Sequence, residues 1–169
     1  SSDLKNARRY MIFFIVAAIL VSLLLLPQTV QPAMRTSKGI IVIDAGHGGF
    51  DGGAAGRLTG VEEAGINLAV AKKLQALFEK NGYTVIMTRE DQDALGDTKG
   101  EDMAKRREII STSGADLVIS IHMNKFADAS VSGPQVFFHE DSAEGERLAK
   151  LIQQALIETL DPPKQRTEH

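Results

Sequence analysis

The chain has 169 residues, of which 43% are hydrophobic and 24% charged, so it is long and apolar enough for one domain with a true core. It contains no cysteine, which excludes a disulfide framework, a thiolate metal site and a cysteine nucleophile. The formal net charge of −3 argues against a nucleic-acid partner. Aromatic residues make up 5% of the chain and none is tryptophan, which argues against a surface that stacks on sugar rings.

An apolar run dominates the first part of the chain. Residues 11–26 are almost all apolar, Pro27 ends the run, and residues 1–10 carry three basic side chains against one acidic side chain. The run is slightly shorter than the about 20 residues that span a bilayer upright, and it also suits the apolar region of a signal peptide. Basic residues before such a run keep the N-terminus inside, so the rest of the chain is expected to be exported.

We therefore expect three segments ahead of the globular domain. Residues 1–10 are predicted to be a basic flank, residues 11–26 a signal-anchor or transmembrane segment, and residues 27–38 a polar linker. A cleaved signal peptide is the alternative for the apolar run, although residues 30–33 show no clean small-x-small cleavage pattern. Residues 39–169 remain for the globular domain.

The globular domain is predicted to open with a buried strand that ends in a glycine-rich loop. Residues 40–43 read IIVI, a run of β-branched residues typical of a strand buried on both faces. His47 follows between Gly46 and Gly48, at the start of a loop that continues to residue 60. Glycines let the backbone turn tightly there, so His47 is well placed to present its imidazole to a ligand.

Strands and helices alternate through the rest of the domain. Apolar residues at three- and four-residue steps predict helices, and short apolar runs bounded by polar loops predict strands. Such alternation indicates a single α/β domain with a mostly parallel sheet flanked by helices. The expected elements are a helix from Glu63 to a stop at Asn81, a strand at 83–88, a helix at about 102–113, a strand at 117–121, a short fourth strand at 135–138, and a helix opened by a capping box of Asp141 and Glu144.

Three side chains of this predicted fold suit a metal ion. His47 and His122 each follow a buried strand, and Glu63 lies at the start of the first helix. Ligands of parallel sheets bind beyond the carboxyl ends of the strands, where all three residues are expected. Two histidines and one carboxylate are a common zinc set in hydrolases, because they leave a fourth position for water. Such an ion lowers the pKa of the water and polarises a carbonyl.

Two other interpretations of these residues stay open at this point. Histidines at strand ends often serve only as structural hydrogen-bonding groups. A glycine-rich loop before a helix can also cradle phosphate, but Glu62 and Glu63 would repel phosphate at that helix N-terminus. The loop also lacks the Gly-Lys-Ser/Thr ending of a phosphate-binding loop.

Several motifs, in order over about 39–160, resemble a known family. The most specific of them are IDAGHGGFDGGA at residues 43–54 and ADLVISIHMN at residues 115–124. With Glu63 before INLA, and with Gly82-Tyr83 and Thr88-Arg89, they resemble the zinc-dependent N-acetylmuramoyl-L-alanine amidases of the Amidase_3 family. SIHMN and the stretch GPQVFFH at 133–139 resemble the germination-specific branch, which acts on spore cortex.

This resemblance implies a zinc site, a substrate and a reaction. The implied ligands of one Zn²⁺ are His47, Glu63 and His122, and Asn124 is implied to contact substrate. Glu62 remains an alternative ligand, because Ala64-Gly65 stands where the family usually has Lys-Asp. The implied substrate is peptidoglycan, cut at the amide between N-acetylmuramic acid and L-alanine of the stem peptide. Arg106 matches a family arginine and is expected to be structural.

The family also uses a glutamate as general base, and this residue is not identifiable here. In the family it lies on a late strand of the kind Val-Leu-Val-Glu-x-Gly-Phe, whereas residues 161–169 read DPPKQRTEH. Glu140 is a weak candidate, and a solvated loop carboxylate is the other interpretation of it. We therefore expect a C-terminally truncated stretch of a longer amidase, with an incomplete sheet.

Two other functions are compatible with these residues. One is a catalytically silent module of the same fold that binds the cell wall or a partner. Another is a zinc carboxypeptidase, which the wide spacing of His47 and Glu63 disfavours, since those enzymes usually carry His-x-x-Glu. An amidase of the sporulation branch can also need an accessory protein to complete its site.

Overall fold

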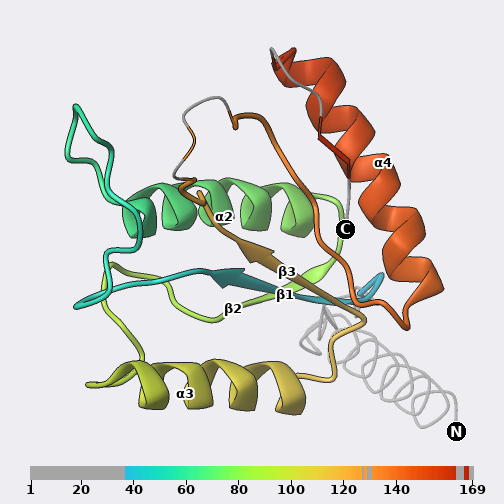
Figure 1. Cartoon of the computed structure of the whole chain (residues 1–169). Coiled ribbons are helices and arrows are strands. Elements are labelled where there is room, and N and C mark those ends of the chain that lie inside the picture. The colour runs from blue at the N-terminus through green and yellow to red at the C-terminus, as the bar shows by residue number, and fades with distance from the viewer. Residues whose placement is uncertain (1–36, 127, 129–130, 163–165, 168–169) are drawn as a thin grey trace, which may run out of the picture. The chain divides into compact units, whose positions relative to one another are not determined.

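The computed structural model describes residues 37–126, 128, 131–162 and 166–167 (Figure 1). The expected basic flank and apolar run, and all but the end of the linker, lie outside these residues. Among the described residues, no helix is long and apolar enough to cross a membrane. The elements are the strands β1 (Ile40–Ala45), β2 (Thr84–Met87) and β3 (Leu117–Ile121), and the helices α2 (Glu63–Lys80), α3 (Lys99–Thr112) and α4 (Ala143–Leu160).

The three strands form one parallel sheet with the order β2-β1-β3. The helices α2 and α3 cover opposite faces of the sheet, and α4 lies beyond β3 (Figure 1). The predicted α/β domain with a parallel sheet between helices is therefore confirmed. In the register of β1 and β3, Ala45 pairs with Ile121, so the two strands end side by side.

Alternate residues of β1 face two different environments, as the strand period of two requires. Ile41, Ile43 and Ala45 belong to an apolar core with Leu68 and Ala71 of α2. Each fully buried large aliphatic side chain contributes roughly 1.5–3 kcal/mol relative to an exposed one. This core fixes α2, and with it Glu63 at its start, against the end of β1.

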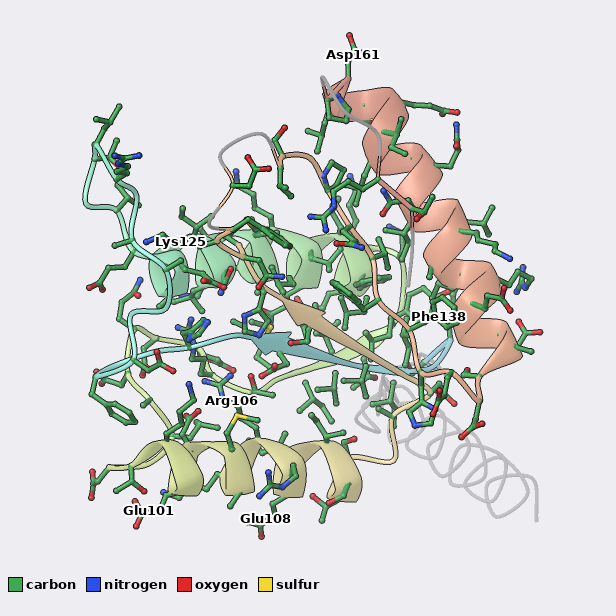
Figure 2. The ribbon with its side chains drawn as sticks, viewed as in Figure 1. Glu101, Arg106, Glu108, Lys125, Phe138 and Asp161 are labelled. Carbon is green, nitrogen blue, oxygen red and sulfur yellow. The ribbon has the colours of Figure 1, made fainter. Side chains whose placement is uncertain are left out.

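The face of β1 toward α3 carries the buried Val42 and, nearer the carboxyl end, Asp44, whose partners are polar. Arg106 of α3 is 3% exposed and donates to Asp44 Oδ1 and to Asp102 Oδ2, at 2.7 Å each. It also donates to the carbonyl oxygens of Ala45 at 2.9 Å and His47 at 2.7 Å. Figure 2 shows Arg106 pointing from α3 toward the sheet. Arg106 therefore has the structural role expected of it.

The predicted fourth strand at 135–138 is wrong. This segment joins no sheet, and its backbone is bonded to Gln153 of α4 instead. The buried amide of Gln153 accepts from Val136 N–H at 2.9 Å and donates to the carbonyl oxygen of Pro134 at 3.0 Å. The Gln153 side chain thus makes the backbone hydrogen bonds that a neighbouring strand would otherwise make.

Two helix starts also differ from the predictions. The helix α3 begins three residues early, because Thr98 caps it by accepting from Glu101 N–H at 3.3 Å. The cap of α4 is Ser142, which accepts from Gly145 N–H at 3.0 Å, and not Asp141. In each case the hydroxyl satisfies an N–H of the first turn.

Candidate metal centre

The histidines and the glutamate predicted as metal ligands lie together at the carboxyl end of the sheet. His47 follows β1, His122 follows β3, and Glu63 is the first residue of α2. One donor atom of each lies within 4.8 Å of the others. Glu63 Oε1 is 3.3 Å from His47 Nε2 and 3.0 Å from His122 Nδ1. The two imidazole rings meet edge to face, with centroids 4.9 Å apart.

The two distances to Glu63 Oε1 fit the spacing of ligands around a tetrahedral metal ion. Ligand bonds of 2.0–2.1 Å, as zinc forms with nitrogen and oxygen, place neighbouring donor atoms about 3.3 Å apart. The two distances to Glu63 Oε1, 3.3 Å and 3.0 Å, are close to this value. Two imidazole nitrogens and one carboxylate oxygen also have the right chemistry for zinc, and three protein ligands leave a position open.

Glycines let the ligands approach so closely. A Cβ atom on Gly46 would lie 2.3 Å from His122 Cε1, and one on Gly53 would lie 2.7 Å from His47 Cδ2. No real Cβ contact is that short, so both imidazole rings need glycine beside them. His47 itself has a φ of 63°, in the left-handed region that residues other than glycine adopt uncommonly, with asparagine, aspartate and histidine the most frequent among them.

The Glu63 carboxyl is held in its ionised form. It is 4% exposed, and burial alone would raise its pKa. Backbone N–H groups of Ala54 and Met123 donate to its two oxygens at 3.0 Å and 2.9 Å, and His122 and Asn67 bond it as well. Together these bonds lower the pKa of Glu63 to about 2, so the carboxylate is ready to bind a cation at neutral pH.

Comparison with known proteins identifies the family of the chain. Residues 41–169 match Amidase_3, described as N-acetylmuramoyl-L-alanine amidase. The chain belongs to this amidase family. It is 40% identical over 137 residues to the germination-specific N-acetylmuramoyl-L-alanine amidase of Bacillus subtilis, an alignment that covers 76% of this chain and 57% of that protein. It is 34% identical over 124 residues to the amidase AmiA of Escherichia coli, covering 72% and 40%.

A solved amidase structure has the same fold. It is the CwlD amidase from Clostridioides difficile in complex with the GerS lipoprotein, with a TM-score of 0.72 and 36% identity, covering 77% of this chain and 71% of that chain. The membership of the amidase family that the motifs indicated is therefore confirmed. The chain spans less than two thirds of the length of the Bacillus and Escherichia relatives.

The other residues of the amidase site prediction lie at different places. Glu62 is exposed and is not part of the group around Glu63. Asn124 is exposed and lines two cavities of about 570 and 280 Å³, one with His122 and the other with Glu63. Glu140 is exposed and comes two residues after Phe138. Figure 2 shows Phe138 near the start of the strands, whereas Lys125, three residues after His122, lies near the start of α2. Glu140 is therefore close to the end of the sheet that is opposite the candidate metal ligands.

Sequence reasoning missed three residues that support the site. Asn67 is fully buried and donates to the Gly46 carbonyl oxygen at 3.1 Å. Arg89 is 3% exposed and donates to the same oxygen at 3.1 Å and to the Ala64 carbonyl oxygen at 2.8 Å, which ties the loop after β1 to the first turn of α2. Asp51 contacts His47. Arg89 and Asp51 both lie within motifs that resemble the amidase family, and this was the feature of the sequence that could have identified them.

Proposed function

We propose that this chain carries the zinc site of an N-acetylmuramoyl-L-alanine amidase that acts on peptidoglycan during cell-wall or spore-cortex remodelling. The supporting observation is the convergence of His47 Nε2 and His122 Nδ1 on Glu63 Oε1, in a member of the amidase family. The proposed reaction is hydrolysis of the amide between N-acetylmuramic acid and L-alanine. The proposed cofactor is one Zn²⁺ per chain.

The chain's residues have separate tasks in this proposal. A bound zinc ion supplies a water of lowered pKa and polarises the substrate carbonyl. His47, Glu63 and His122 hold the ion, and the N–H groups on Glu63 keep that carboxylate ionised and oriented. The two cavities that Asn124 lines offer room for the parts of the substrate that flank the scissile amide.

The general base has no strong candidate among the described residues. The described group of possible metal ligands holds a single carboxylate, Glu63, whose oxygens accept N–H bonds. This observation keeps a second candidate function in place, a metal-binding module of the same fold that binds the cell wall or a partner without cutting it. Both functions predict that the chain binds zinc, but only the amidase predicts that peptidoglycan is hydrolysed.

The proposed setting of the site is outside the cytoplasm. The Bacillus relative is named as germination-specific, and the apolar run at residues 11–26 has the composition of an export signal or anchor. The structural relative from Clostridioides difficile was solved with a lipoprotein. We include a lipoprotein partner in the proposal for this reason.

The test combines zinc binding with product analysis. The full chain is titrated with Zn²⁺, incubated with purified peptidoglycan, and the products are identified by mass spectrometry. Stem peptides that begin with L-alanine, lost in Glu63→Gln and kept in the matched control Glu62→Gln, support the amidase. Their loss in Glu140→Gln as well would make Glu140 the base.

Three other outcomes bear on these alternatives. Zinc binding with intact peptidoglycan supports the silent module, or an amidase whose base lies outside these residues. A folded chain without zinc binding contradicts both functions. A chain in which Glu62→Gln removes zinc and Glu63→Gln does not would contradict the ligand set.

A further inference from the structure

We propose that Asp51 is the positioning residue of His47, which it orients so that Nε2 faces the metal position. This inference rests on the proposed metal site. Asp51 Oδ2 lies 3.0 Å from His47 Nδ1, while His47 Nε2 lies 3.3 Å from Glu63 Oε1. One ring nitrogen therefore faces Asp51 and the other faces the candidate metal ligands.

Both ring nitrogens of His47 face a carboxylate, and an ionised carboxylate only accepts hydrogen bonds. Glu63 Oε1 already accepts from Met123 N–H at 2.9 Å and lies farther from the ring, 3.3 Å from Nε2, than Asp51 Oδ2, which lies 3.0 Å from Nδ1. The ring proton is therefore assigned to Nδ1, which leaves the lone pair of Nε2 for a cation. Carboxylates that accept from the second nitrogen of a metal-binding histidine are common partners of such sites, because they fix the tautomer and the ring orientation.

Asp51 is itself held in place by the loop that it closes. Its backbone exchanges hydrogen bonds with Gly48, from Gly48 N–H at 2.8 Å and to the Gly48 carbonyl oxygen at 3.0 Å. Its Oδ1 accepts from Gly53 N–H at 3.2 Å. The carboxylate is thus fixed opposite the ring of His47, four residues earlier.

His47 needs an external partner because the backbone does not orient its ring. It lies beyond β1 in a left-handed conformation, outside any helix or strand. Arg106 fixes its carbonyl oxygen, and Gly53 packs against one side of its ring. Asp51 is the described carboxylate that faces Nδ1, with Oδ2 at 3.0 Å, so it is placed to set the direction of Nε2.

Lys99 provides a control that tests whether Asp51 acts only through its charge. Its Nζ lies 3.4 Å from Asp51 Oδ2, but its side chain is 72% exposed. Exposed ion pairs contribute little and are screened by salt. Removing Lys99 keeps the contact between Asp51 and His47, whereas removing Asp51 deletes it.

The experiment measures zinc affinity and the protonation of His47 Nδ1 on the full chain. Affinity is measured by competition with a chromogenic chelator for the wild type and four variants. Asp51→Ala is expected to weaken zinc binding about 10- to 100-fold. Asp51→Asn should recover part of the loss, because its carbonyl oxygen can still accept from Nδ1. Lys99→Met and the exposed-carboxylate control Asp97→Asn should each change affinity by less than about threefold.

Nitrogen-15 NMR gives a readout that does not need the metal. At about pH 8, a protected proton on His47 Nδ1 is expected in both the metal-free and the zinc-loaded wild type, and it should be lost in Asp51→Ala. A proton on Nε2 with none on Nδ1 would overturn the proposal. So would unchanged zinc affinity in a folded Asp51→Ala variant. A wild type that binds no zinc contradicts the metal site, while the Nδ1 proton still decides the role of Asp51.

Discussion

The two faces of β1 differ in chemistry at the carboxyl end of the strand. Toward α2, Ile41 and Ile43 pack into an apolar core. Toward α3, Asp44 binds the guanidinium of Arg106, which also fixes the carbonyl oxygen of His47. Apolar contacts are non-directional, so they stabilise the sheet without fixing the path of the loop that leaves it. Hydrogen bonds are directional, so those of Arg106 fix the start of this loop, which carries the candidate ligand His47.

Removing Arg106 should have the largest effect on this arrangement. Arg106→Met leaves the carboxylates of Asp44 and Asp102 without their buried partner, and such losses cost about 3–5 kcal/mol. We expect a drop of that size in the free energy of unfolding, measured with urea, together with weaker zinc binding. The neighbouring exposed residue provides the control, Arg107→Met. Equal effects of the two changes would contradict the assigned role of Arg106.

Low pH should reduce the free energy of unfolding, because it protonates the carboxylates of Asp44 and Asp102. Burial alone would raise the pKa of Asp44 and Asp102, but hydrogen bonds from Ser120 and Arg106 to Asp44, and from Arg106 to Asp102, hold both below the ordinary value of 3.8. Their contribution to stability is therefore complete above that value and is lost as the pH falls through the lower pKa values of the folded state.

The measurement is the urea midpoint as a function of pH. In Arg106→Met the acid slope should become shallower, because the two carboxyls lose their main partner. A residual slope should remain from Glu63, whose pKa in the folded chain is about 2. Identical slopes in the wild type and the variant would show that Arg106 is not the cause.

The smallest effect is expected on the apolar face. Ile43→Val removes one buried methylene group and should cost about 0.5–1.5 kcal/mol of unfolding free energy. Zinc affinity should not change, since the polar contacts that direct the loop remain. A change in affinity beyond about threefold would mean that the two faces of β1 do not have separate roles.

The convergence of the candidate ligands was predictable because it depends on topology. A buried strand followed by a helix places His47 and Glu63 at the same end of a sheet, and a second parallel strand brings His122 there. The supporting contacts were harder to foresee. The bond between Asp51 and His47 depends on a left-handed backbone at His47, and no periodicity of the sequence reports such a conformation.

The failed strand prediction has a related cause. Residues 135–138 have strand-like composition, but composition does not say which partner meets the backbone groups. Here the amide of Gln153, 17 residues after Val136, meets them. The missed caps of α3 and α4 are one- to three-residue errors of the same kind, since a hydroxyl decides each start.

The left-handed conformation of His47 also limits how this site can change by mutation. His122 has no positive φ, so many residues can replace it without backbone strain. At position 47 a β-branched residue would lose the ligand and strain the loop together, whereas asparagine or glycine would lose the ligand alone. Among proteins of this fold that bind no metal, we therefore expect asparagine or glycine to be frequent at the position of His47. At the position of His122 we expect a broader set of residues.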